Sequence, residues 1–199
     1  MPAKSSKRDD LLDAALKLIA GQGFHAAPMS QIAEEANIGV GTIYRYFKNK
    51  DELINALYLE VRKRMAEAIG EGQGADAPVK AQFITSLQNL IGYLVDHPTE
   101  IQFTEQYENS PFITEATKAE IEKVASPISD LLIRAQTEKL LKPLPFSVLM
   151  SMFSGASMGL LKACMQKKSS PAKMNDASTS EAIEALWDML IPKNTEGAK

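Results

Sequence analysis

The sequence predicts an all-α protein of about nine helices. Apolar residues recur at the three- and four-residue spacing of a helix face, as at Leu53, Ile54, Leu57 and Val61. No stretch alternates apolar and polar residues in the way that a half-buried strand does. At 199 residues, the chain can bury one substantial core or two modest ones.

Short joints separate the predicted helices. Prolines mark several of these joints, because proline cannot continue a helix, and the glycine-rich residues 70–78 form a flexible break. The expected helices cover residues 7–22, 30–36, 41–47, 50 to the break, 79–97, 99–109, 113–141 with a kink at Pro127, 146–167 and 179–190.

Residues 30–47 have the pattern of a helix-turn-helix. Ile32 and Ala33 begin an apolar stripe on the first helix, and Asn37 stands at the turn, where a left-handed backbone is needed. Asparagine and glycine adopt that backbone at low cost. In a DNA-binding helix-turn-helix, the second helix lies in the major groove.

The second helix of this pair has one apolar side and one polar side. On a helical wheel, Val40, Ile43 and Phe47 share the side that we expect to face the core. Arginine can donate two hydrogen bonds to guanine, and hydroxyl groups can reach phosphates, so the opposite side suits DNA. The candidate DNA-binding residues are Gly41, Thr42, Tyr44, Arg45, Tyr46, Lys48 and Lys50.

Two alternatives apply to this set. Tyr44 and Tyr46 could be core aromatics, but with Arg45 between them three polar-tipped residues lie on the outward arc, which favours DNA contact. Lys48 and Lys50 alone would also fit a solvated helix start. Asn49 and Glu52 have the spacing of a capping box for that helix.

The residues from Ile32 to Leu53, in their order, resemble the DNA-binding signature of the TetR/AcrR family of bacterial transcriptional regulators. The resemblance extends from the first predicted helix to about Tyr58. Two positions depart from the family pattern: Asn37 stands where glycine is commoner, and Pro28 stands where serine or threonine is usual.

This resemblance implies both a fold and a function. It implies a homeodomain-like, three-helix DNA-binding domain at residues 1–48 and a helical ligand-binding and dimerisation domain at residues 49–199. The expected protein is a cytoplasmic homodimeric repressor that a small-molecule ligand releases from a double-stranded DNA operator, an inverted repeat. The operator contacts that it implies are Gly41, Thr42, Tyr44, Arg45, Tyr46 and Lys50.

Charge is distributed as this arrangement requires. Residues 1–64 hold ten Lys and Arg against eight Asp and Glu, whereas residues 65–199 hold twelve against seventeen. The net charges of +2 and −5 add to the total of −3. We therefore expect only the N-terminal part to meet phosphate, through few contacts per subunit.

Other features bound the location of the protein. Cys164 is the single cysteine, so no intrachain disulfide can form, as suits a reducing cytoplasm. We interpret it as a small buried residue, with a redox role as the lesser alternative. The N-terminus lacks the apolar segment of a signal peptide. The uncharged residues 143–161 are interrupted by serines and predict a buried interface helix, not a membrane span.

Small residues recur every fourth position in the helix at 146–167, where they would let two backbones approach closely. With the last helix, this stripe predicts a four-helix dimer interface, although the periodicity fits packing within one subunit equally well. The candidate interface residues are Ser151, Gly155, Gly159, Ala163, Ile183 and Trp187.

The middle helices combine apolar walls with a few polar tips, as small-molecule pockets do. Ordinary core packing explains each residue equally well, and the ligand is unidentified. The candidate pocket residues are Tyr93, Phe103, Gln106, Tyr107, Phe112, Met150 and Phe153.

Two other functional classes remain as alternatives. A ligand-independent architectural DNA-binding protein would lack a cavity among the middle helices. An all-helical enzyme would need a catalytic or metal-binding cluster, but His25, His97 and Cys164 have no neighbouring ligand pattern. We therefore expect no catalytic residues, no metal and no cofactor besides the effector. An activator of transcription is a further alternative to the repressor.

Overall fold

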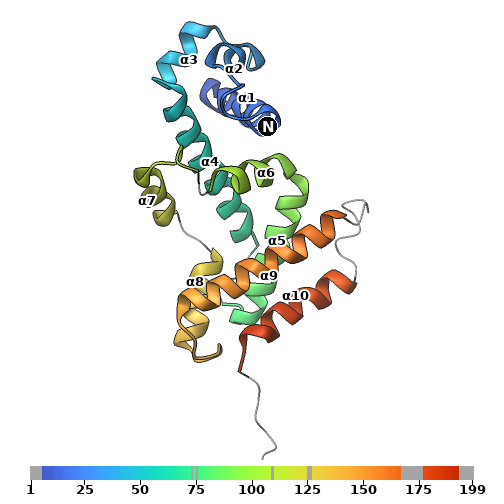
Figure 1. Ribbon diagram of the computed structural model, residues 1–199. Helices are drawn as coiled ribbons and strands as arrows, with labels where there is room; N and C mark the ends of the chain where they lie inside the picture. The colour runs from blue at the N-terminus through green and yellow to red at the C-terminus, as the bar shows by residue number, and fades with distance from the viewer. Residues whose placement is uncertain are drawn as a thin grey trace, which may run out of the picture. The chain divides into compact units, whose positions relative to one another are not determined.

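The computed structural model describes residues 6–72, 74, 76–108, 110–124, 127–166 and 177–192. These residues form ten helices and no strand, which confirms the all-α fold class (Figure 1). The helices are α1 (Lys7–Gln22), α2 (Met29–Glu35), α3 (Val40–Tyr46), α4 (Lys50–Gly70), α5 (Val79–Asp96), α6 (Pro98–Tyr107), α7 (Glu115–Lys123), α8 (Pro127–Thr137), α9 (Phe146–Gln166) and α10 (Ala177–Leu190).

The expected long helix at residues 113–141 is two helices instead of one kinked helix. Helix α7 ends at Lys123 and α8 begins at Pro127. Proline lacks an amide hydrogen and clashes with the preceding turn, so it suits the first position of a new helix. The pattern therefore located the interruption at Pro127 but underestimated it, which is why ten helices replace nine.

The chain packs as two compact units that do not follow chain order. The first unit contains Met1–Arg64 and His97–Val124, and the second contains Met65–Asp96 and Ala125–Lys199. Each unit has its own hydrophobic core. Helix α4 begins in the first unit and ends in the second, so the chain enters the second unit without leaving the helix.

In the first unit, α1 packs against both α2 and α6 (Figure 1). Ser6 and Asp9 form a capping box that starts α1, in which the Ser6 hydroxyl accepts from the Asp9 amide at 3.2 Å. Residues from the middle of the chain complete the core: Phe103 and Tyr107 from α6 and Ile113 after it are buried together with Leu11 of α1.

Asn55 of α4 fixes the connection between α6 and α7. Its side-chain amide donates to the Phe112 carbonyl at 2.8 Å and accepts from the Thr114 amide at 2.9 Å. One side chain thus satisfies two backbone groups that lie 57 and 59 residues further along the chain. This pair of bonds attaches residues 112–114 to the first unit.

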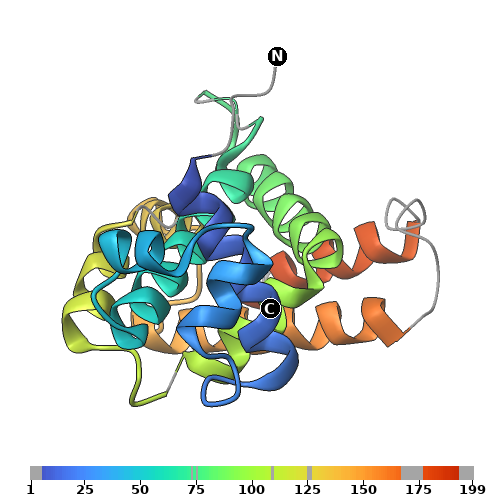
Figure 2. The same ribbon diagram turned by 90° about the horizontal axis from the view of Figure 1, so that it is seen from above.

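In the second unit, α5 packs against α8, α9 and α10. Figures 1 and 2 show α9 and α10 running side by side. Phe83 of α5 is fully buried, with ring centroids 5.6 Å from Phe153 and 5.1 Å from Trp187. These aromatic contacts join α5, α9 and α10 into one core.

Candidate nucleic-acid interface

The turn between α2 and α3 has the geometry that its sequence predicts. Asn37 has a φ of 54°, in the left-handed region. The Ile38 amide donates to the Ala33 carbonyl at 2.8 Å, and the Asn37 amide donates to the Glu34 carbonyl at 2.9 Å. These two bonds form a Schellman motif, which satisfies the last carbonyls of α2. Ile38 then packs against the core, which directs the chain into α3.

Two residues attach α3 to the core. Ile43 and Phe47 are buried, as the helical wheel predicts, but Val40 is 46% exposed. The expectation that Val40 faces the core was therefore wrong. A wheel gives the direction of a side chain but not the extent of the surface that covers it, and the first turn of α3 extends beyond that surface.

The outward face of α3 carries two large aromatic side chains with a cation between them. Tyr44 is 52% exposed and Tyr46 is 42% exposed, and Arg45 between them is exposed as well. Gly41 is exposed and Thr42 is half-buried. Five of the predicted DNA-binding residues therefore lie on one short helix, with three long side chains in solvent.

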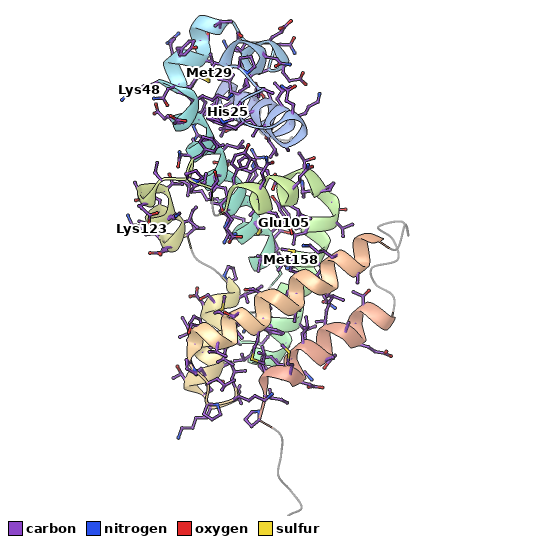
Figure 3. All side chains as sticks on the ribbon, viewed as in Figure 1. His25, Met29, Lys48, Glu105, Lys123 and Met158 are labelled. Carbon is purple, nitrogen blue, oxygen red and sulfur yellow. The ribbon has the colours of Figure 1, made fainter. Side chains whose placement is uncertain are left out.

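The two candidate lysines differ in direction. Lys48 is exposed and extends away from the ribbon (Figure 3). Lys50 instead donates to the Phe24 carbonyl and lies 4.4 Å above the centre of the Phe24 ring. Burial lowers the pKa of Lys50, and the neighbouring Asp51 carboxylate opposes that shift. The ammonium group of Lys50 is thus engaged within the first unit.

Hydrogen bonds at the start of α4 hold the short connection between α3 and α4. The Asn49 side chain accepts from the Glu52 amide at 2.8 Å, as a capping residue does. The Glu52 carboxylate accepts from the amide of Lys48, at 2.8 Å, one residue before the position that a capping box predicts. Glu52 therefore holds the backbone between α3 and α4 through both its carboxylate and its amide.

An ionic network supports the first unit behind α3. Arg64 of α4 pairs with Asp13 of α1 at 2.9 Å and with the buried Glu100 of α6 at 3.5 Å. Arg8 lies 3.8 Å from the Glu60 carboxylate and 5.9 Å from the centre of the Phe47 ring. These contacts connect α1, α4 and α6 to the residue that ends α3.

The predicted pocket residues divide between the two units. Phe103, Tyr107 and Phe112 pack in the core of the first unit, whereas Met150 and Phe153 pack in the core of the second. Gln106 is exposed and Tyr93 is half-buried. The hydroxyl of Tyr107 accepts a hydrogen bond from the Phe24 backbone, while burial raises its pKa. The five apolar and aromatic members thus contribute to two separate cores.

The predicted interface residues divide by exposure. Ser151, Gly155, Gly159 and Ala163 are all exposed along α9. Ile183 and Trp187 are buried inside the second unit, where Trp187 contacts Phe83. The assignment of these last two to an exposed interface was therefore wrong. Helical spacing identifies an apolar face, but it does not tell which neighbour covers that face.

The described part of the chain holds no cluster of three or more His, Cys, Asp or Glu residues able to bind a metal. His25 contacts the rings of Phe24 and Phe112 edge-on, and His97 precedes α6 as its N-cap. The side chain of Cys164 lies outside the described residues. No described helix is both long enough and apolar enough to cross a lipid bilayer.

Sequence reasoning missed two features of this region. The exposure of Val40 could have been suspected from its flanking glycines, which bring no side chains to cover it. The role of Asn55 had no local signal, because its partners at Phe112 and Thr114 are distant in the sequence.

Family comparisons extend over both units. Residues 11–57 match the family described as bacterial regulatory proteins, tetR family, and residues 78–191 match a tetracyclin repressor-like C-terminal domain. A solved TetR family protein from Vibrio parahaemolyticus is 30% identical, with a TM-score of 0.76 over 94% of this chain and 100% of that chain. A TetR family regulator from Shewanella sp. PV-4 has a TM-score of 0.82 at 21% identity, over 95% of this chain and 100% of that chain, which supports the fold alone.

Curated relatives match over shorter spans. An HTH-type transcriptional regulator of Haemophilus influenzae is 31% identical over 109 residues, which are 55% of this chain and 58% of that protein. The fatty acid metabolism regulator protein of Bacillus subtilis is 38% identical over 98 residues, which are 49% of this chain and 50% of that protein. The chain thus covers only 50–58% of the length of these two relatives.

Proposed function

Because the chain belongs to the TetR family of bacterial regulatory proteins, we propose that it is a sequence-specific DNA-binding repressor. The observation that carries this proposal is the outward face of α3, where Tyr44, Arg45 and Tyr46 are exposed next to Lys48. Arginine can donate two hydrogen bonds to a guanine edge, and the tyrosine hydroxyls and the lysine can reach phosphates.

Function divides along the chain in this proposal. Residues 1–48 contact DNA, and residues 49–199 bind the effector and dimerise. The first 64 residues carry a net charge of +2 and the rest a net charge of −5, so the DNA phosphates attract one end of the chain only. Lys50 supports the α1–α2 turn through the Phe24 carbonyl and does not itself contact phosphate. A repressor of chromosomal genes acts in the bacterial cytoplasm.

Selection from a random DNA pool at near-physiological salt tests the proposal most broadly. We expect an enriched inverted repeat, with half-sites about one helical turn of DNA, ~34–36 Å, apart. Salt-sensitive background binding without an enriched sequence would favour the architectural alternative. Tyr44→Ala should weaken binding to all duplexes alike, since we assign Tyr44 to phosphate.

A homodimer is the second part of the proposal. The exposed small residues of α9 would let the same helix of another copy approach closely, with α10 beside it. A Cβ atom at Gly155 or Gly159 would meet nothing within 4 Å inside the subunit, and both positions are exposed, so leucine at both positions should leave the subunit folded. We expect this double variant to sediment as a monomer, whereas Gly21→Leu, at an exposed glycine of α1 with equal space, should remain dimeric.

Release by a small molecule is the third part. The ligand would bind more tightly to a form of the dimer in which the distance between the two α3 helices does not match the operator half-sites. It would then weaken DNA binding by its differential affinity for the two forms, ~1–3 kcal/mol. The name of the Bacillus subtilis relative makes a long-chain fatty acid the first probe. The test adds palmitate to the complex with the selected duplex and measures dissociation by fluorescence anisotropy. Five-fold weaker binding would support it, and unchanged binding would exclude this molecule as the effector.

A further inference from the structure

Val40 is an apolar side chain that the core does not use. It is the first residue of α3 and is 46% exposed. Tyr44 follows four residues later and is 52% exposed, so the two side chains are neighbours on the outward face. The buried attachment of α3 relies on Ile43 and Phe47. Val40 is therefore not explained by packing inside the chain.

Gly41, which follows Val40 inside α3, is not explained by the chain either, whereas Gly39 is the N-cap of α3, a position where glycine is common. Neither Gly39 nor Gly41 has a positive φ. A Cβ atom at Gly41 would meet nothing within 4 Å, and one at Gly39 would meet only the Thr42 hydroxyl, at 4.0 Å. Glycine destabilises a helix relative to alanine. Because the glycines beside Val40 have no side chains, a binding partner can come close to the backbone of this turn and contact the Val40 side chain.

The chemistry of the surrounding residues identifies that partner. Arg45, Tyr46 and Lys48 are exposed beside this strip, and they favour an anionic, hydrogen-bonding surface over an apolar protein surface. In the major groove, the C5-methyl group of thymine is the one apolar group that a base pair presents. Valine has no donor or acceptor to use there and only methyl groups to offer.

We propose that Val40 is a specificity-determining residue that packs against the C5-methyl group of a thymine in each operator half-site. This proposal rests on the DNA-binding function proposed above and adds to it the identity of one base pair. Arginine at position 45 would read a guanine independently, so the two residues specify different positions of the site.

Replacing thymine with deoxyuridine removes that methyl group and leaves base pairing intact. The probes are the duplex enriched from the random pool and a set of duplexes in which each thymine in turn is deoxyuridine. Dissociation constants are measured for the full chain, for Val40→Ala and for Ile133→Ala. Ile133 lies on α8 in the second unit and is 48% exposed, which makes it a matched loss of exposed apolar surface.

We expect one thymine per half-site whose replacement weakens binding of the unchanged protein and of Ile133→Ala about three- to five-fold, the effect of one methyl group leaving an apolar contact. The same replacement should change binding of Val40→Ala by less than 1.5-fold, since the contact is already lost. Because Val40 is exposed, its variant should keep the thermal stability of the unchanged protein.

The outcomes separate the two proposals. Equal losses in all three proteins, or no loss at any thymine, would overturn the role of Val40 and leave an operator-binding repressor intact. An enriched site without thymine in its half-sites would do the same. Failure to enrich any sequence would overturn the proposed function, and the role of Val40 with it.

Discussion

The two units of this chain differ in how far their residue types determine a function. In the first unit, the exposed face of α3 combines Arg45 with two tyrosines. None of the three belongs to the hydrophobic core of that unit. In the second unit, the core consists of aliphatic and aromatic residues, most of them on α5, α8, α9 and α10. Residue types therefore indicate a function where specific polar side chains are exposed to solvent. They indicate less where a position requires only apolar surface.

The boundary between the units differs from the expected domain boundary. The expected DNA-binding domain ends at residue 48, after α3, whereas the first unit continues to Arg64 and also includes residues 97–124. Phe103 and Tyr107 of α6 complete a core that begins with α1. A change in the position of α6 would therefore act on the same core that holds α3.

The largest effects on stability should come from removing one buried aromatic ring from either core. Phe103→Ala and Phe153→Ala each remove a buried ring and should each cost about 3–5 kcal/mol of unfolding free energy. Hydrogen exchange should distinguish them: Phe103→Ala should increase exchange in α1 and in the first turns of α4, and Phe153→Ala in α5 and α8. If Phe103→Ala increased exchange only in α5, α8, α9 and α10, residues 97–124 would not belong to the first unit.

A smaller effect should come from the residue that attaches residues 112–114. Asn55→Ala removes a donor to the Asp51 and Phe112 carbonyls and an acceptor for the Thr114 amide, and we expect a loss of about 1–3 kcal/mol in urea unfolding. Asn89→Ala is the matched change in the second unit, where the amide only donates, to the Ile69 and Glu71 carbonyls. A larger loss for Asn89→Ala would contradict the importance of this attachment.

The smallest effect on stability should have the opposite sign. Gly41→Ala adds a methyl group in open space and should stabilise α3 by about 0.5–1 kcal/mol, since glycine is the poorer helix former. The same methyl group should weaken binding to the selected duplex, because it lies where the partner approaches. Calorimetry and anisotropy on one preparation measure both changes, and tighter DNA binding would show that close approach at Gly41 is not needed.

Sequence alone predicted the fold class and the turn of the helix-turn-helix, because Asn37 and the apolar periodicity act locally. It also identified the outward positions of Tyr44 and Arg45. It failed for Val40, whose cover depends on where the core ends, and for Ile183 and Trp187, which pack on α5 instead of an exposed surface. Lys50 turned toward Phe24, a partner 26 residues earlier in the chain that no helical wheel includes.

We propose that α3 recognises base sequence through Arg45. This proposal is tested most directly by the ratio of affinities for the selected duplex and a scrambled duplex at fixed salt. Arg45→Ala should reduce that ratio by about 1–3 kcal/mol, or roughly five- to 150-fold, if the arginine contacts guanine through two hydrogen bonds. Lys123→Ala, at an exposed lysine of α7 in the same unit, should leave the ratio unchanged. An unchanged ratio in Arg45→Ala, with equal weakening on both duplexes, would contradict the account.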